Sequence, residues 1–469
     1  MTEAGSAPLT AAWPPVYDSG YRPQAKEPYW DRRRETMSAD ERASVVLSKI
    51  QAVMRWAYDR APFYRRRWSE AGLQPGDIRS LADFERVPTI NKADLRADQS
   101  EHPPYGSYLC IEPLEIARIH GTSGTSGRPT AFAWTADDMD RIAEAHARIM
   151  WSFGLRPSDT VFVGSIFSLY VGSWGTLLGA ERLGAAVFPF GAGVAGQTSQ
   201  AIQWMRQLRP TAFYGTPSYA LRLAEVARAE GIDPRSLGLR IMFFSGEPGA
   251  GIPSMKRLIE STFGASCIDS GSMGEATPWM NIAECAQRTG MHLWQDLVYT
   301  ELLDPRTWQR VPYGGTGTPV YTQLERRCQP MIRLVSGDLA EWTDAPCACG
   351  RTYPRFPRGI IGRIDDMLTI RGENVYPSAI EDVLRSFTGL GSEFEIVVTR
   401  ENQLDDLRVR VETTPIGGAP DDLAGRVTAA LRRVLGIRPT VELCEPNSLK
   451  RTDLKSRRVR DERRLNTRT

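Results

Sequence analysis

Residues 120–130 read His-Gly-Thr-Ser-Gly-Thr-Ser-Gly-Arg-Pro-Thr, and this stretch carries the sharpest local signal in the chain. Glycines let backbone N–H groups converge on an anion, hydroxyl groups add donors, and Arg128 adds positive charge. The composition therefore indicates a phosphate-binding loop. The stretch matches neither GxxxxGK[ST] nor GxGxxG, and the same composition also occurs in plain surface turns, so both interpretations stay open on these residues alone.

The chain around this loop alternates between two kinds of segment. Short β-branched or aromatic runs are separated by helical stretches between about residues 105 and 360, at 160–163, 186–189, 212–214, 241–244 and 266–268. This alternation predicts βα units on a parallel sheet. Upstream, apolar residues recur at helical spacing from residue 39 until Pro62 interrupts them, and a second helix is expected at 63–71.

The pattern changes after Gly362 and predicts a separate small α+β domain. Its expected elements are helices at 377–387 and 421–435 and strands at 393–399 and 407–412. The predicted fold class is therefore α/β, with a large domain of βα units and a small C-terminal α+β domain. The expected divisions are an irregular surface arm at 1–38, a large domain at 39–363 and a small domain at 364–469.

Composition excludes several classes of protein. The 469 residues are 41% hydrophobic and 24% charged, which is typical of a folded globular chain rather than a disordered or fibrous one. Fifty-eight basic against 56 acidic residues leave a net charge of +2, so nothing in the overall charge favours nucleic acid or an anionic membrane. Residues 161–180 are uncharged but rich in Gly and Ser, which favours a buried strand followed by a helix over a membrane span.

Two further features bear on the cellular environment. The first twenty residues lack the basic and apolar regions of a secretory signal, so a cytoplasmic location is expected. The seven cysteines are an odd number in a long chain, which argues against a disulfide framework and leaves metal binding as the more interesting use.

Residues 122–130 closely resemble the [ST]SG[TS][TS]GKPT phosphate loop of adenylate-forming enzymes, particularly those similar to phenylacetate–CoA ligase. Further segments agree with that family in order and approximate spacing, namely residues 46–98, YGTPSYALRLAE from Tyr214, FFSGEP at 243–248, SGDLAEW from Ser336 and GRIDDMLTIRGENVYPSAIE from Gly362. The resemblance extends from about residue 40 to the end of the chain. It implies a two-domain enzyme that converts a carboxylic acid, ATP and CoA into acyl-CoA, AMP and pyrophosphate.

The resemblance also implies roles for particular residues. Asp338 would accept hydrogen bonds from the ribose hydroxyls, Glu275 would bind Mg²⁺, Arg363 would reach the ribose or phosphate, Lys455 would bridge the acyl carboxylate and α-phosphate, and Asp365 would be the hinge of the small domain. The implied nucleotide-binding set is Thr122, Ser123, Gly124, Thr125, Ser126, Gly127, Arg128, Ser245, Gly246, Glu247, Pro248, Asp269, Ser270, Asp338 and Arg363. By residue type alone, Asp338 could instead be a loop N-cap and Lys455 a solvated charge in a basic tail.

The acid pocket is where the sequence departs from the family. The usual Tyr-Gly-x-[ST]-Glu is here Gly-Ser-Met-Gly-Glu at 271–275, so an aromatic ring and a hydroxyl are missing. The segments that line the family's acyl pocket contain Phe167, Tyr170, Trp174, Tyr214, Gly215, Phe244, Gly271 and Gly274. Their aromatic residues favour a flat aromatic acid, although aromatic residues at such spacing are also typical of a plain core.

Cys285, His292, Cys347 and Cys349 are ligand types suited to tetrahedral zinc. Their spacing is not that of a CxxC knuckle, and buried free thiols are the alternative. Part of the phenylacetate–CoA ligase-like group has ECxxxxxxH followed by PCxCGRT, which matches residues 284–292 and 346–352, and this set is associated with a structural metal.

Two other functions stay open. The enzyme could transfer the activated acid to a carrier-protein thiol or an amine, or activate nitrite for aryl diazotisation; the altered 271–275 segment is the support for this alternative. The chain could also be a non-catalytic nucleotide-binding protein of the same fold, against which the retained Asp338, Arg363, Glu275 and Lys455 argue. A homodimer is possible.

Overall fold

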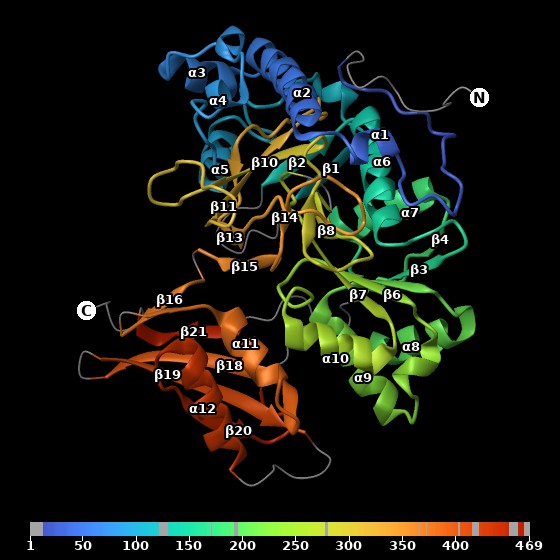
Figure 1. The fold of residues 1–469 in the computed structure, drawn as a ribbon, viewed down its shortest axis with the longest axis vertical. Coiled ribbons are helices and arrows are strands. Elements are labelled where there is room, and N and C mark those ends of the chain that lie inside the picture. Colours follow the sequence, from blue (N-terminus) through green and yellow to red (C-terminus); the bar gives the residue numbers. More distant parts are fainter. Residues whose placement is uncertain are drawn as a thin grey trace.

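The computed structural model describes residues 13–121, 130–169, 171–191, 196–276, 280–364, 366–371, 373–401, 404–414, 422–449 and 458–463. A large body formed by the first three quarters of the chain lies above a smaller C-terminal body (Figure 1). Among the described residues, no helix is both long and apolar enough to cross a bilayer.

Helices dominate the N-terminal part of the large domain. They are α1 (Arg32–Glu35), α2 (Ala39–Arg60), α3 (Pro62–Glu70), α4 (Leu81–Phe84) and α5 (Lys92–Glu101). The expected start and end of α2 are confirmed: the Ser38 hydroxyl accepts from the Glu41 amide at 3.1 Å, and Pro62 opens the next helix. The apolar face of α2, including Val46, Ile50 and Val53, joins a core that also contains Tyr299 and Tyr321.

An eight-stranded sheet forms the centre of the large domain, in the order β14-β9-β8-β7-β6-β5-β3-β4. Its strands are β3 (Thr160–Val163), β4 (Ala186–Phe188), β5 (Ala212–Gly215), β6 (Ile241–Phe244), β7 (Ser266–Gly271), β8 (Ile282–Glu284), β9 (Met291–Leu293) and β14 (Arg355–Phe356). The strands from β4 to β7 are parallel, as expected. β8, β9 and β14 pair antiparallel, so the predicted parallel sheet ends at β7.

Helices cover both faces of the parallel strands because side chains alternate across them. α6 (Ala136–Ser152) and α7 (Val171–Leu183) share a core with Val161, Tyr214 and Phe243. α8 (Gln197–Leu208), α9 (Pro217–Ala229) and α10 (Pro253–Phe263) share the other core, with Phe213 and Phe244.

A second, antiparallel sheet was not anticipated by the βα pattern. It has the order β10-β11-β13-β15, with β12 paired to β11. Its strands are β10 (Val298–Leu303), β11 (Thr316–Gln323), β12 (Leu334–Val335), β13 (Asp338–Glu341) and β15 (Ile360–Arg363). A hairpin of β1 (Arg118–Gly121) and β2 (Ala131–Trp134) flanks the glycine-rich loop. The expectation of βα units up to residue 360 is therefore wrong beyond β7.

The N-terminal arm is more deeply embedded than the predicted irregular surface arm. Trp30 is 1% exposed and the Glu35 side chain is fully buried. The Glu35 carboxylate lies 2.7 Å from Arg351, and the Tyr29 hydroxyl donates to the Cys349 carbonyl at 3.1 Å. The stretch was misjudged because its aromatic and charged residues have no period, and their partners lie between 114 and 320 residues away in the sequence.

The small domain combines two sheets and two helices. β16 (Leu368–Ile370) pairs with β17 (Glu373–Val375), and the larger sheet has the order β20-β19-β18-β21. The remaining elements are α11 (Pro377–Arg385), β18 (Leu390–Glu401), β19 (Leu404–Thr413), α12 (Leu423–Leu435), β20 (Thr440–Cys444) and β21 (Val459–Asp461). One apolar core that includes Ile380, Val409 and Val427 joins these elements, as expected of an α+β unit.

Candidate active site and metal centre

Glu275 lies in the loop after β7, where two positively charged residues from other segments meet it. Its side chain is buried, and its Oε1 lies 3.2 Å from Nζ of Lys92, the first residue of α5. Its carbonyl oxygen accepts a hydrogen bond at 3.0 Å from Arg326 Nη1. Neither Lys92 nor Arg326 could be predicted from the sequence, because no motif marks them; the one available signal was a basic residue directly after Asn91, the N-cap of α5.

Arg326 is itself held rigidly. Its guanidinium lies 3.3 Å from the centroid of the Trp134 ring, and Nη2 donates to the Ala133 carbonyl at 2.9 Å. Burial lowers the pKa of Arg326 to about 10, so the side chain remains a cation at neutral pH. It fixes the backbone of the Glu275 loop against β2, the strand that follows the glycine-rich loop.

Asp338 and Arg363 face each other across two neighbouring strands. They are Cα partners in the β13–β15 pair, and Arg363 Nη1 lies 3.4 Å from Asp338 Oδ1. The Ser336 hydroxyl accepts from the Asp338 amide at 3.0 Å. Both side chains remain partly exposed, which leaves a carboxylate and a guanidinium together at the edge nearest the small domain.

The carboxyl ends of β5, β6 and β7 bring several predicted residues together, as expected for ligand-binding residues on an open parallel sheet. The Tyr214 hydroxyl lies 2.6 Å from Ser245 Oγ, and the Ser245 amide donates to the Gly215 carbonyl. The Ser270 hydroxyl donates to the Phe244 carbonyl at 2.7 Å. Beyond them Glu247 accepts from the amide of Ser218 at the start of α9, while Gly246 and Pro248 are exposed.

The predicted acid-pocket residues do not all share one face. The rings of Phe167 and Trp174 pack edge to face, with their centroids 5.1 Å apart. The His120 ring centroid is 6.5 Å from that of Trp174. Phe244, however, is fully buried in the core beneath α9 and α10, on the opposite face of the sheet from Tyr214. Its placement in the acid pocket is therefore corrected to a core position.

The two glycines that replace the family's aromatic ring and hydroxyl have different surroundings. A Cβ on Gly271 would lie 3.2 Å from Ile282 Cδ1, whereas one on Gly274 would lie 3.8 Å from Val171, in ordinary contact. Ile282 therefore packs closely against Gly271, on the side where a side chain would begin.

Asp269 is partly exposed, but its carboxyl group is closely surrounded. A Cβ on Gly251 or on Gly359 would lie 2.5 or 2.6 Å from its Oδ2, so backbone closes tightly over the carboxyl group. Burial and the neighbouring Glu284 raise the pKa of Asp269 to about 8, although Lys256 opposes the rise. The group is therefore mostly protonated at neutral pH.

Several predicted residues lie outside the described part of the chain. They are Thr122, Ser123, Gly124, Thr125, Ser126, Gly127, Arg128, Tyr170, Asp365 and Lys455.

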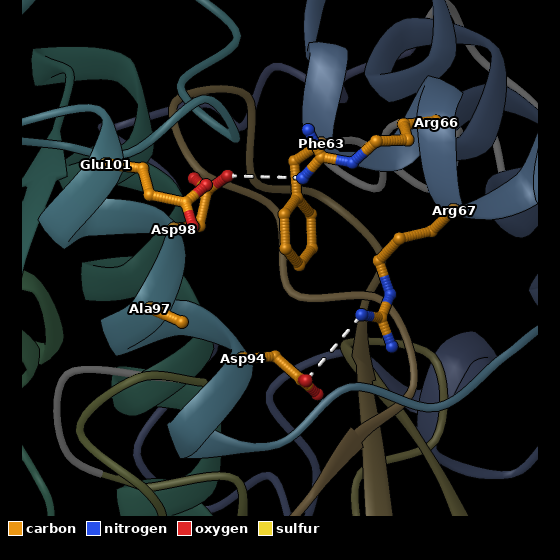
Figure 2. A pocket seen from close by; sticks show the side chains of 7 residues that line it. All are labelled: Phe63, Arg66, Arg67, Asp94, Ala97, Asp98 and Glu101. Atoms are coloured by element: carbon orange, nitrogen blue, oxygen red, sulfur yellow. Dashed lines mark ion pairs between the residues drawn. The ribbon is translucent and has the colours of Figure 1, made fainter.

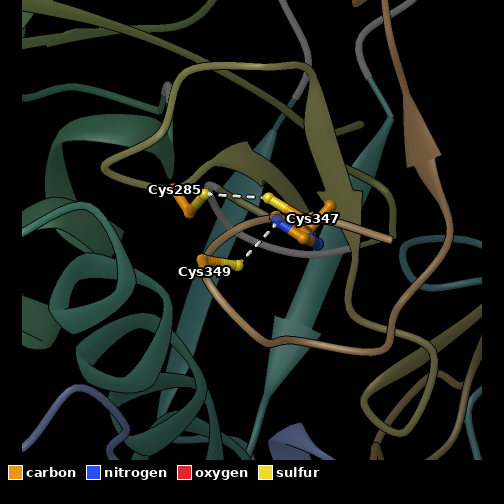
Figure 3. A group of neighbouring side chains, drawn as sticks. Cys285, Cys347 and Cys349 are labelled. Atoms are coloured by element: carbon orange, nitrogen blue, oxygen red, sulfur yellow. Dashed lines mark hydrogen bonds between the residues drawn. The ribbon is translucent and has the colours of Figure 1, made fainter. Parts of the chain in front are cut away.

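The four predicted metal ligands converge on one point (Figure 3). The ligand atoms of Cys285, His292, Cys347 and Cys349 all lie within 4.8 Å of one another. The Sγ atoms of Cys285 and Cys347 are 3.8 Å apart, and Cys349 Sγ is 3.4 Å from His292 Nε2. Tetrahedral zinc would separate two sulfurs by about 3.8 Å and a sulfur from a nitrogen by about 3.6 Å. The donor set therefore fits such an ion.

The pKa values of Cys347 and Cys349 are lowered, whereas the hydrogen bond with Cys349 and burial raise that of Cys285. Hydrogen bonding from Cys285 and the proximity of His292 lower the pKa of Cys349 strongly, which favours the thiolate that binds metal. The ligands come from two segments, since Cys285 and His292 flank the turn between β8 and β9 whereas Cys347 and Cys349 precede β14. An ion here would tie these segments together.

A cavity of about 150 Å³ between α3 and α5 contains none of the predicted site residues (Figure 2). Four of its charged residues form two ion pairs, since Arg66 lies 3.6 Å from Asp98 and Arg67 lies 3.6 Å from Asp94. Both of its arginines are engaged in these pairs, so the site described above remains the better candidate for binding an anionic substrate.

Comparison with known families decides the assignment. The model described as "AMP-binding enzyme" matches residues 29–321, and that described as "AMP-binding enzyme C-terminal domain" matches residues 372–463. This chain belongs to the AMP-binding, adenylate-forming enzyme family. It is an AMP-forming acid–CoA ligase, with the large and small domains characteristic of that family.

Individual relatives of this AMP-binding enzyme differ in their acids. Phenylacetate-coenzyme A ligase of Thermus thermophilus is 34% identical over 81% of this chain and 83% of its own length. A crystal structure of 2-hydroxyisobutyryl-CoA ligase in the postadenylation state, in complex with 2-HIB-AMP, is 53% identical over 96% of both chains, with a TM-score of 0.92. The same ligase in the thioesterification state, with 2-HIB-AMP and CoA, is 54% identical over 96% of both chains, with a TM-score of 0.75.

Proposed function

We propose that this ligase activates a small branched 2-hydroxy acid of the 2-hydroxyisobutyrate type and transfers it to CoA. The observation that carries this proposal is the 53% identity over 96% of both chains to 2-hydroxyisobutyryl-CoA ligase, compared with 34% to a phenylacetate-CoA ligase. The close packing of Ile282 against Gly271 supports it, because it leaves little room for a bulky acid on that side. The proposal replaces the aromatic acid expected from the sequence.

The reaction has two steps with balanced products. A carboxylate oxygen of the acid attacks the α-phosphorus of ATP, and pyrophosphate leaves. The thiol of CoA then attacks the acyl carbon, loses its proton, and AMP leaves. Forming the adenylate first makes AMP the leaving group, so that thiol attack becomes feasible.

The residues around Glu275 and Asp338 suit the first step. Two anions must approach each other, so the site needs cations and donors fixed before reaction. We assign the ribose hydroxyls to Asp338 and a ribose or phosphate oxygen to Arg363, which lies 3.4 Å from that carboxylate. We assign Lys455 to the contact between acyl carboxylate and α-phosphate, and the 122–128 loop to the outer phosphates. Glu275 would hold Mg²⁺, which neutralises phosphate charge when bound.

The cysteine–histidine cluster has a structural role in this proposal. Its geometry and thiolate character support one zinc ion held by Cys285, His292, Cys347 and Cys349. Four protein ligands would leave no open position, which is typical of structural rather than catalytic zinc.

The test is pyrophosphate release with a panel of acids, with and without CoA. 2-Hydroxyisobutyrate is expected to give the highest kcat/KM, and phenylacetate a value lower by at least about tenfold, because one mismatched group in a binding site costs about 1–3 kcal/mol. Equal or better use of phenylacetate would restore the aromatic acid. Adenylation without thioester formation would point to a carrier-protein or amine acceptor, and release that needs nitrite would point to diazotisation.

A further inference from the structure

The N-terminus of α10 lacks a cap from its own domain. Its N-cap residue is Ile252, whose side chain has no oxygen to accept a hydrogen bond. The amide of Ser254 instead donates at 3.1 Å to Oδ1 of Asp382, which lies on α11 in the small domain. Ser254 is buried, and its hydroxyl has no hydrogen-bond partner within the described residues. The start of α10 therefore depends on a carboxylate from the other domain.

Neighbouring contacts join the same two faces. The hydroxyl of Ser392, on β18, donates to a carboxylate oxygen of Glu225 on α9. Burial raises the pKa of Glu247, and Glu381 from the small domain adds to the rise across the interface. Figure 1 shows α11 beside α10. Asp382 thus belongs to a polar interface between α9 and α10 of the large domain and α11 and β18 of the small one.

The arrangement of the two domains seen here matches one state of a related ligase better than another. The chain superposes on 2-hydroxyisobutyryl-CoA ligase with a TM-score of 0.92 in the postadenylation state and 0.75 in the thioesterification state, at nearly the same sequence identity. The domain arrangement seen here therefore resembles that of the postadenylation structure more closely than that of the thioesterification structure.

We propose that Asp382 is a positioning residue that stabilises the postadenylation arrangement by capping α10 across the domain interface. Rotation of the small domain toward the thioester-forming arrangement removes this cap and leaves the Ser254 amide without its acceptor. Asp382 thereby sets the balance between the two half-reactions without touching a substrate. The proposal does not depend on which acid the enzyme activates.

The two half-reactions can be measured separately in the full-length enzyme. Pyrophosphate release with acid and ATP reports adenylation, and thioester formation from synthetic acyl-adenylate and CoA, without ATP, reports the second step. Asp382→Ala is expected to slow the first step and speed the second, so that the ratio of the two rates falls by about fivefold, the size of effect expected for one lost helix cap. Asp382→Asn, which keeps an oxygen acceptor, should change both rates less.

A matched control and a second measurement make the outcome decisive. Glu442→Ala, on β20 of the same domain, removes an ion pair to Arg410 on β19 and should leave both rates unchanged. Hydrogen exchange of the amides at 254–256 should be faster in Asp382→Ala than in the wild type. Equal changes in both half-reactions, no change in either, or unaltered exchange at 254–256 would overturn the proposal. If Asp382→Ala does not fold, Asp382→Leu, which also removes the acceptor but keeps a side chain of similar size, provides the same readouts.

Discussion

The ammonium group of Lys92 lies 3.2 Å from the Oε1 atom of Glu275, and this contact joins the helical N-terminal segment to the loop after β7. The carboxylate is buried, whereas the lysine side chain is 39% exposed, so the lysine can move while the carboxylate is fixed. Lys92 is thus placed to neutralise Glu275 before substrates bind and then to follow the charge of an arriving phosphate or carboxylate.

Replacement of Lys92 by alanine is therefore expected to slow adenylation. The site would lose a cation where two anions must meet, and the loss of one charged contact typically lowers the rate by about 10²-fold. Acid-dependent pyrophosphate release measures the effect. Lys26→Ala, which alters an exposed lysine of the N-terminal arm, is the control. A near-normal rate in Lys92→Ala would mean that the contact only neutralises Glu275 in the free enzyme.

Lys455→Ala is expected to lower the rate of acid-dependent pyrophosphate formation by about a thousandfold, because a charged contact to the first transition state is lost. ATP binding, and thioester formation from supplied acyl-adenylate, should remain largely intact. Isothermal titration with ATP and the two half-reaction assays distinguish these effects. Adenylation at the wild-type rate would show that the tail is aligned incorrectly, and Lys450 would be tested next.

Metal removal is expected to loosen the N-terminal arm. The loop that leaves the cluster holds the arm directly: the Thr352 hydroxyl donates to the Met37 carbonyl at 2.6 Å, and Arg351 pairs with Glu35. Elemental analysis should find one zinc per chain, and Cys349→Ser should lose it. Hydrogen exchange over residues 13–38 should then increase, whereas Cys444→Ser, in the small domain, should retain both metal and protection. Full protection of the arm in metal-free protein would contradict this role.

The stability of the enzyme should depend on the protonation of Asp269. Its pKa is about 8 in the folded protein and near the ordinary 3.8 when unfolded, so the folded state binds the extra proton between these values. The contribution of Asp269 to the free energy of unfolding therefore falls as pH rises from about 4 to 8. Asp269→Asn should remove that dependence and unfold at a higher temperature than the wild type at pH 9. If the melting temperatures of the two proteins change by the same amount between pH 5 and pH 9, the assignment is contradicted.

Much of the fold could be predicted because its signals are local. Strands 160–163 and 241–244 and the start of α2 at Ser38 follow from β-branched runs and a capping serine that act within a few residues. The antiparallel strands after β7 could not be separated from βα units, because short apolar runs look alike in both. Trp30 was misplaced because its burial depends on distant residues such as Trp151.

The candidate site shows the same division. Asp338 and Arg363 were found through motifs, and the structure makes them strand partners. Lys92 lies in a segment whose sequence looks like an ordinary helix start, and only folding brings it to Glu275. Phe244 was assigned to the acid pocket because its segment contains site residues, but the alternation of a strand directs its side chain into the opposite core.

The cysteine–histidine cluster lies directly before the part of the chain that leads into the small domain. His292 pairs with Arg355 across β9 and β14, and β15 follows β14 after only a short turn before the chain enters the small domain at β16. The cluster would therefore act as a rigid support for the strands that lead into the small domain. Such support matters because flexible strands would bend when the attached domain changes its orientation. Two strands held together by one metal ion would keep β15, and with it Arg363, in a fixed position if the small domain rotates about Asp365 as proposed.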